Sequence, residues 1–556
     1  MKKYGIVTLI LLLNLLLISC QQKNSQVNPP VIPPDTSTSV NYSNSSFKTT
    51  HFSGSQICAD CHNGITGTGD VDVSLELDWA STMMANSARD PLFRAKVASE
   101  TLRNPSIKTE IEQKCSRCHT PMANIEAKLS GQPVALLPPG FLSPEHEYFD
   151  AAMDGISCTL CHQIENDEDF GEKISFSGNF SINLDRIIYG PFATPVASTM
   201  VSATGYNPEL SSHISTSEIC SSCHNLFTDI VDATTDQLTG EKFPEQTTYE
   251  EWEQSSFAQA GSGAEKSCQD CHMPEISGVK VANRGTGLSI QNKFSRHYLV
   301  GANTFMLDIL NNNKSLLGIK ANNFEKAIER TRDLLQSSAS ISVKNPSNIA
   351  GTINFTVNVN NLTGHKLPSG YPARRAYLHV TITDADNTNV FESGLMNANG
   401  SIVGVDDDTN SEKYEPHHNV ITQSNQVQVY ESIMQNTNNE VTYTLLNGAS
   451  YKKDNRLLPE GFDKNIVSSD IAPDITTLAD LNFIAASDDV IYRLELAGTA
   501  PYKVNVELNY QSVSYQYAQD LFKDLDKHEY INTFKQVYDT AKIQKETISA
   551  VNITIE

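Results

Sequence analysis

The chain has 556 residues, of which 39% are hydrophobic and 19% are charged. This composition is that of a folded globular protein long enough for two or three domains, and it excludes wholesale disorder. The formal net charge of −24 excludes a nucleic-acid partner, because a protein that neutralises phosphates needs a basic face. A cationic partner, or simple solubility, fits this charge better.

The first twenty residues have the pattern of a processing segment. Lys2 and Lys3 precede an apolar run over residues 5–18, which is too short to span a bilayer but suits a secretory signal. The run ends in Leu17-Ile18-Ser19-Cys20, which resembles the lipobox of bacterial lipoproteins. The resemblance implies lipid attachment at Cys20 and a location at the cell envelope, on the outer membrane, facing the periplasm or the surface. The alternative is an ordinary signal peptide with a chance cysteine.

Residues 21–50 are rich in Ser, Asn, Pro and Gln. Such a segment cannot bury enough apolar surface to order itself, so we expect a flexible stalk. No stretch after Cys20 approaches the length of a transmembrane helix, so a lipid would be the only membrane attachment.

The other ten cysteines form five Cys-x-x-Cys pairs, and each pair is followed directly by a histidine. This motif is typical of c-type haem attachment: the two thiols add to the two vinyl groups of one haem, and the histidine ligates its iron. Five covalent haem c groups are therefore predicted. The attachment residues are Cys58, Cys61 and His62; Cys115, Cys118 and His119; Cys158, Cys161 and His162; Cys220, Cys223 and His224; and Cys268, Cys271 and His272.

Other cysteine chemistries fit this pattern poorly. Zinc sites need paired knuckles and do not require a histidine after every pair. Iron–sulfur clusters use other spacings, and thioredoxin-like motifs occur once per domain beside a strand.

The second axial ligands are sought among the nine histidines outside the motifs. His51 and His213 each stand seven residues before a motif, in similar Ser-containing settings, and His297 follows the last motif. His365 lies in a Gly/Pro-rich loop that leaves a predicted strand. These four are predicted ligands, and His417 is the candidate for the fifth, with His418 or His146 as alternatives. His379 is expected on the polar face of a strand and His528 on a charged helix face, while Met122 and Met273 are expected to pack beside their haems.

Hydrophobic periodicity divides the rest of the chain. Residues 51–295 alternate short helical patches with Gly/Pro-rich loops, and residues 296–345 have helical spacing. Residues 346–515 alternate with period two, as in Ile353, Phe355, Val357 and Val359, which predicts an antiparallel β-sandwich. Residues 516–556 are expected to form a C-terminal helix and tail. The predicted fold class is thus α+β multidomain: a mostly helical and irregular pentahaem domain, a connector and a β-sandwich.

Several stretches resemble the exported multihaem cytochromes of the cytochrome c-554/c-prime family. They are Asp90-Pro-Leu-Phe with Cys115-Ser-Arg-Cys-His-Thr-Pro-Met, Asp154-Gly-Ile-Ser-Cys-Thr-Leu-Cys-His, Ser217-Glu-Ile-Cys-Ser-Ser-Cys-His-Asn and Cys268-Gln-Asp-Cys-His-Met-Pro. Thr363-Gly-His-Lys-Leu-Pro-Ser-Gly, Val427-Gln-Val-Tyr-Glu and Lys453-Asp-Asn-Arg-Leu-Leu-Pro-Glu-Gly-Phe resemble a β-domain fused to some bacterial multihaem cytochromes. The resemblance implies closely stacked haems and electron transfer. The type member has four haems, so its ligand pairings do not transfer whole.

Three functions remain open at this point. The leading one is an electron carrier with mostly bis-histidine haems in envelope respiratory transport, serving redox partner proteins such as other cytochromes. The second is a reductase or oxidase of a small nitrogen or sulfur compound, which needs one haem with an open face. The third is a homo-oligomer or filament in which one distal ligand comes from the next subunit.

Overall fold

The computed structural model describes residues 44–556, so the predicted signal peptide with Cys20 and most of the stalk lie outside the described residues. The described residues all belong to one structural unit that begins at Asn41. Within them, no helix has both the length and the apolar character needed to cross a bilayer.

All five motifs lie on short helices, and the motif spacing explains why. Helical backbone places residues three apart on the same face, so both thiols of a Cys-x-x-Cys pair point the same way. The histidine is the last helical residue or the one just after it. The five helices are α2 (Ser55–His62), α5 (Lys108–His119), α8 (Cys158–Cys161), α10 (Glu218–His224) and α12 (Cys268–His272).

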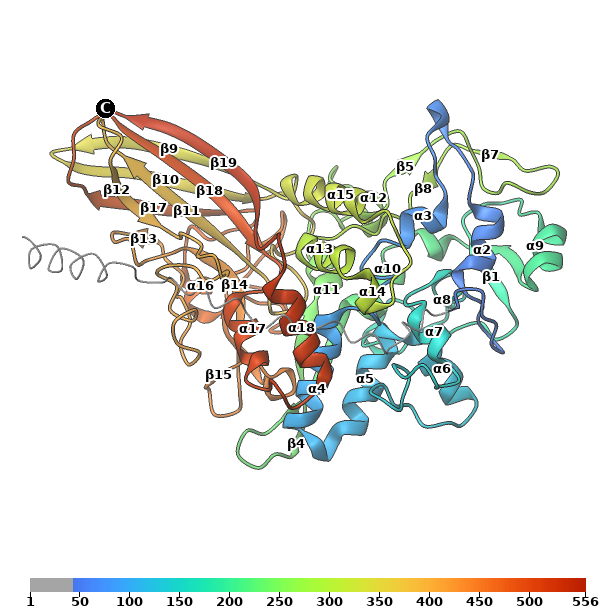
Figure 1. The fold of residues 1–556 in the computed structure, drawn as a ribbon. Coiled ribbons are helices and arrows are strands. Elements are labelled where there is room, and N and C mark those ends of the chain that lie inside the picture. The colour runs from blue at the N-terminus through green and yellow to red at the C-terminus, as the bar shows by residue number, and fades with distance from the viewer. Residues whose placement is uncertain (1–43) are drawn as a thin grey trace, which may run out of the picture. The chain divides into compact units, whose positions relative to one another are not determined.

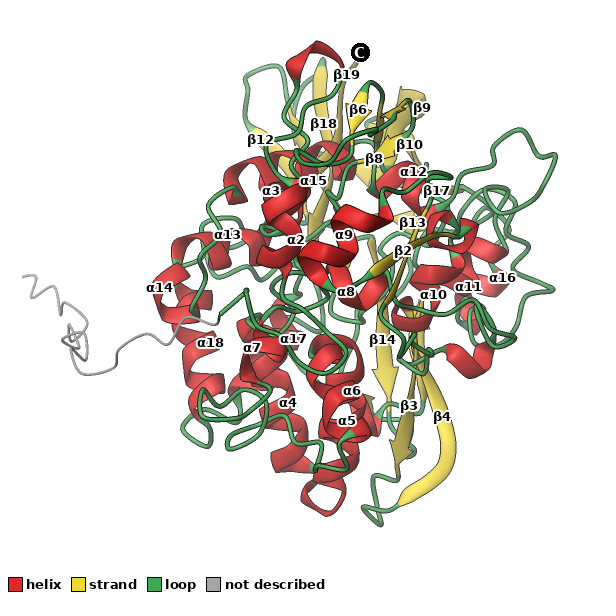
Figure 2. Ribbon diagram, turned by 90° about the vertical axis from the view of Figure 1, so that its right-hand side faces the viewer, coloured by secondary structure: helices red, strands yellow, loops and turns green. Residues whose placement is uncertain are grey.

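Between these helices run loops, small two-stranded sheets and further helices (Figure 2). The helices are α3 (Leu75–Trp79), α4 (Pro91–Arg103), α6 (Pro121–Leu129), α7 (Phe149–Met153), α9 (Ala197–Thr204) and α11 (Thr248–Glu253). The strands are β1 (Ile187–Gly190), β2 (Asn207–Leu210), β3 (Asn225–Val231), β4 (Leu238–Thr247), β5 (Glu275–Ile276), β6 (Val279–Lys280), β7 (Ile290–Gln291) and β8 (Phe294–Ser295).

Helix α4 is the centre of the helical core. It starts at Pro91 because the Asp90 carboxylate accepts hydrogen bonds from the N–H groups of Leu92 and Phe93, and proline suits the first helical position. Its buried face packs against two helices from far along the chain, α17 (Tyr515–Phe522) and α18 (Glu529–Asp539), as Figure 1 shows for α18. The apolar core that contains α4 also includes side chains of α13 (Thr304–Asn312), α14 (Lys314–Leu317) and α15 (Phe324–Gln336).

The predicted connector (296–345) and C-terminal segment (516–556) therefore share one apolar core with residues of the predicted pentahaem domain. The single helix expected near the C-terminus is two helices, α17 and α18, followed by a ten-residue strand, β19. Sequence periodicity reveals which face of a helix is apolar but not which distant segment covers that face.

Two sheets form the β-part of the molecule. Their strand orders are β13-β17-β10-β9 and β15-β14-β11-β18-β19, with β12 paired to β11 and β16 to β14. The bounds are β9 (Ala339–Ile349), β10 (Thr352–Asn361), β11 (Arg375–Thr383), β12 (Asn389–Ser393), β13 (Val420–Ile421), β14 (Val429–Gln435), β15 (Val441–Thr442), β16 (Ser450–Asp454), β17 (Ser487–Glu495), β18 (Tyr502–Gln511) and β19 (Glu546–Ile555); α16 (Ile475–Ala479) lies in a connection.

The alternation of apolar and polar residues in the strands produces the predicted buried face. Ile353, Phe355, Val357 and Val359 of β10 are all buried, in one core with side chains of the second sheet such as Val380. The α+β fold class is confirmed. The β-part extends beyond residues 346–515 at both ends, because β9 begins at Ala339 and β19 pairs with β18. It also has one departure from antiparallel pairing, the two-residue parallel contact of β13 with β17.

Candidate haem sites

A cavity of about 1560 Å³ connects the five motifs, and all ten motif cysteines and all five motif histidines line it. The ten thiols form no disulfide with one another. A tightly packed protein interior does not leave such a void between side chains, and a large cavity is costly to keep empty. Paired free thiols around one internal space match what covalent haem attachment requires, so the residues present fit haem c.

Hydrogen bonding prepares the motif histidines as metal ligands. In four of them Nδ1 lies against a backbone carbonyl, which can only accept, so Nδ1 carries the proton and Nε2 keeps its lone pair. The four contacts are His62 with Val281 O (2.7 Å), His119 with Ser87 O (3.4 Å), His162 with Tyr189 O (2.6 Å) and His272 with Val300 O (2.5 Å).

Burial lowers the pKa of His62, His162 and His272, and it lowers the pKa of His119 and His224 to about 4. All five rings are thus held neutral at pH 7, the form that binds a metal.

His162 of the third motif faces His297 across the cavity. Their ring centroids are 6.3 Å apart and their planes differ by 16°. An imidazole nitrogen binds a metal at about 2.0 Å, so two imidazoles on opposite sides of one ion have centroids about 6 Å apart. His297 Nδ1 contacts Ser295 O at 3.1 Å, which leaves its Nε2 for the metal. Parallel rings at this separation could hold one iron between them.

His272 of the fifth motif faces His365 in the same way. The centroids are 6.4 Å apart and the planes differ by 16°. His365 Nδ1 lies 2.8 Å from Lys366 O, so its Nε2 is also unprotonated. The ring belongs to the loop between β10 and β11, so the β-part of the chain places a histidine opposite the motif whose cysteines lie on α12.

A buried ionic cluster, which the sequence analysis missed, fixes this loop. Glu251 of α11 accepts hydrogen bonds from the Lys366 N–H (3.1 Å) and the Ser369 hydroxyl (2.6 Å) and pairs with Arg456 at 2.9 Å. Asp454 pairs with both Arg456 (2.8 Å) and Lys366 (2.7 Å). Lys366 and Arg456 occur in two of the stretches quoted for resemblance, but nothing in the sequence joins them to Glu251, which is 115 residues from Lys366.

The two histidines placed seven residues before a motif lie outside the cavity lining and differ from each other. His51 Nδ1 contacts the Glu126 carboxylate at 3.1 Å, an arrangement that leaves Nε2 for a metal. His213 donates from Nε2 to Ile164 O (2.9 Å), and its Nδ1 accepts from the Ser211 hydroxyl (2.6 Å). Both ring nitrogens of His213 are therefore occupied.

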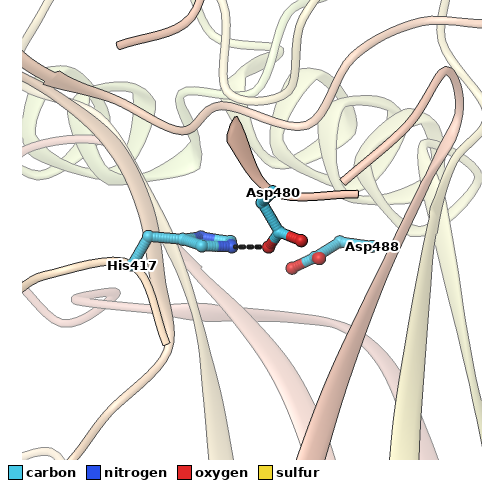
Figure 3. Close-up of side chains that lie close together, drawn as sticks. All are labelled: His417, Asp480 and Asp488. Carbon is cyan, nitrogen blue, oxygen red and sulfur yellow. Dashed lines mark hydrogen bonds and ion pairs between the residues drawn. The ribbon is translucent and has the colours of Figure 1, made fainter. Parts of the chain in front are cut away.

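His417 also lies outside the cavity lining, in a polar cluster of the β-part with Asp480 and Asp488 (Figure 3). Gln428 and Asn455 each turn their amide NH₂ towards Nδ1, at 2.9 and 3.1 Å. Backbone N–H donors at their carbonyl oxygens fix both orientations. His417 Nδ1 is thus an acceptor, and Nε2 carries the proton that it donates to Asp480 at 3.0 Å. The ring offers no free lone pair to a haem iron.

The two alternatives to His417 are also away from the cavity lining. His418 Nε2 contacts Glu415 at 2.7 Å, and His146 Nδ1 accepts the Tyr148 N–H at 3.1 Å. Across residues 44–556, His297 and His365 are the histidines outside the motifs that line the cavity. His62, His119 and His224 have no second histidine facing them in the described part of the chain. Phe93 instead stacks on His119, with centroids 3.6 Å apart.

Ten thiols around one cavity, neutral motif imidazoles and two opposed histidine pairs define a protein that holds several covalently attached haems. Residues 57–163, which contain the first three motifs, match the family described as cytochrome c554 and c-prime. The chain is a multihaem c-type cytochrome. Among solved structures it is similar to a penta-heme cytochrome c552 from Thermochromatium tepidum, with 15% identity, a TM-score of 0.49, and coverage of 91% of this chain and 100% of that one. No curated protein matches it.

Proposed function

We propose that the chain carries five haem c groups, one per motif, and transfers electrons among them. The observation that carries the proposal is that all five motifs open into one cavity. Haem c supplies one-electron chemistry through its iron. The residues of the chain attach the haems, hold the motif imidazoles neutral and oriented, and keep neighbouring attachment points close together.

Contacts between cysteines of different motifs support an order for these neighbours. The Cys58 thiol lies close enough to that of Cys158 for this neighbour and burial to raise the pKa of Cys58, and the same holds for Cys223 beside Cys118 and for Cys220 beside Cys268. Cys161 lies close enough to Cys220 and Cys223 to raise the pKa of both. The attachment points therefore follow one another in the order first, third, fourth and fifth motif, and the second motif lies beside the fourth.

Mass and redox measurements test this function together. Intact mass spectrometry of the mature protein should show five haem additions, and a potentiometric titration should require five electrons per chain. Four or fewer haems, or a site that exchanges no electron with its neighbours in a pulse-reduction experiment, would contradict the proposal.

A second candidate function is reduction or oxidation of a small nitrogen or sulfur compound at a haem with an open face. Its support is that only the third and fifth motifs have an opposed histidine among the described residues. All five motifs end in His, so the lysine-ligated catalytic motif of some nitrite reductases is absent from the sequence. Turnover of nitrite, hydroxylamine or tetrathionate with a reduced dye, together with a high-spin ferric signal, would favour this candidate.

We further propose that the protein is exported and anchored by lipid at Cys20, with cationic redox proteins, such as other cytochromes, as partners. The lipobox-like sequence and the net charge of −24 support this. His51 stays a predicted distal ligand, and association into oligomers or a filament would give it a haem to reach. A Cys20→Ser variant should lose labelled fatty acid and membrane association; retention of both would contradict the anchor.

A further inference from the structure

Glu245 of β4 is a buried carboxylate without a counter-ion of its own. Glu245 is 3% exposed and lines the cavity near the second motif. Its Oε2 has no hydrogen-bond partner among residues 44–556. Burying an ionised carboxylate without a partner is costly, so such a group becomes neutral unless a positive charge lies nearby.

The cations around Glu245 are already committed. Lys96 pairs with Glu100 of the same helix at 2.9 Å and donates to Tyr443 O at 2.6 Å. Glu100 also accepts the Leu445 N–H at 2.7 Å. Lys114 of α5 pairs with Asp229 at 3.1 Å. Neither lysine is hydrogen-bonded to the Glu245 carboxylate.

The remaining groups near Glu245 are the neighbouring Gln246 side chain, which with Lys96 and Lys114 favours the ionised form, three tyrosines and the second motif. The Tyr451 hydroxyl donates to Glu245 O at 3.1 Å, and the hydroxyls of Tyr371 and Tyr517 are hydrogen-bonded to each other. From α5, Cys115 and Cys118 lie within electrostatic reach of the carboxylate. Burial, with a further contribution from the negative charge of Glu100, raises the pKa of Glu245 to about 8. Glu245 is thus able to change its protonation state near neutral pH.

We propose that Glu245 is a redox-linked proton site: it takes up a proton when the iron held by His119 is reduced and releases it on oxidation. One electron arrives from a low-potential donor or from a neighbouring haem, reducing iron(III) to iron(II). One proton arrives from water and converts the carboxylate to a carboxylic acid. The electron removes one positive charge close to the carboxylate, and in a buried setting the lost attraction is large. The proposal rests on haem attachment at Cys115 and Cys118, as in the proposed function.

Redox titration of the full-length holoprotein at several pH values between about 6 and 9 tests this coupling. In the native protein, the midpoint potential of one haem should fall as pH rises. Glu245→Gln, which keeps the shape and removes the titrating group, should abolish that pH dependence. Glu241→Gln is the matched control, because Glu241 is exposed on the same strand, and it should behave like the native protein.

A second measurement observes the protonation of the carboxyl group directly in the native protein. Infrared difference spectra of the native protein should gain a protonated-carboxyl C=O band on reduction, and Glu245→Gln should lack that band. Absence of the band in the native protein, or an unchanged pH dependence in Glu245→Gln, would overturn the proposal. Haem content distinguishes failure of the proposed function from failure of the proton site. A missing haem at the second motif contradicts the proposed function. Five attached haems whose potentials do not change with pH contradict only the proton site.

Discussion

His272 and His365, which are 93 residues apart in the sequence, face each other with ring centroids 6.4 Å apart. The first belongs to the last attachment motif and the second to a loop of the β-part. The β-part thus places a histidine opposite the last attachment motif, and the residue after that histidine, Lys366, is hydrogen-bonded to Glu251 of α11.

Replacement of His365 should change one haem only. In His365→Ala the fifth-motif iron loses its second imidazole, so one low-spin ferric signal should be replaced by a high-spin signal in electron paramagnetic resonance. His379→Ala is the control, because His379 lies on β11 and contacts Glu392 at 3.0 Å, away from the cavity lining. An unchanged spectrum in His365→Ala would exclude His365 as the ligand.

The buried cluster should control the same site indirectly. Glu251→Gln removes one charge from a group in which Glu251 and Asp454 balance Arg456 and Lys366, and leaves a buried positive charge uncompensated. We expect the free energy of unfolding to fall by about 3–5 kcal/mol. The fifth-motif signal should also become heterogeneous, because the His365 loop loses its anchor.

Glu253→Gln, in an exposed position of the same helix, is the control for this charge change and should leave both quantities unchanged. Loss of stability in Glu251→Gln with a native fifth-motif spectrum would mean that the cluster supports the fold without positioning His365.

The sequence predicted haem attachment better than it predicted which histidines face the motif histidines. Five motifs, the α+β fold class and the inward face of β10 follow from local patterns, because attachment spacing and strand alternation are local properties. The similar settings of His51 and His213 were misleading in one respect: the chain places a carboxylate against one ring and a hydroxyl and a carbonyl against the other. Glu251, Lys366 and Arg456 meet only in the folded chain, so no spacing rule could have found their cluster.

Acid should weaken the same cluster. Burial alone would raise the pKa of Asp454, but Arg456 and Lys366 outweigh burial and lower it to about 2. A carboxylate whose folded-state pKa is below its unfolded value stabilises the fold above the unfolded pKa, and this contribution is lost as pH falls through the folded pKa. Asp454 should therefore contribute about 2 kcal/mol that disappears between pH about 4 and 2.

Thermal unfolding followed by near-UV circular dichroism at a series of pH values checks this. Asp454→Asn should be less stable than the native protein at neutral pH, and the difference should shrink towards pH about 2. A difference that is constant over this pH range would show that the ionised carboxylate of Asp454 is not the source of the effect.

Two glycines beside attachment motifs provide a matched test of backbone packing. Gly155, just before Cys158, and Gly64, just after His62, both have φ +64°, a conformation that disfavours any other residue. A Cβ at Gly155 would lie 2.6 Å from Met84 O and 2.7 Å from Ala85 O, whereas at Gly64 nothing lies within 4 Å. Gly64→Ala should therefore lower the free energy of unfolding by about 1 kcal/mol through backbone strain alone. Gly155→Ala should cost about 2–3 kcal/mol more, because the added methyl meets two fixed carbonyls, and should reduce haem attachment at the third motif. Chemical denaturation and haem content of the two variants measure the difference, and equal effects would show that the segment around Met84 and Ala85 yields to the new side chain.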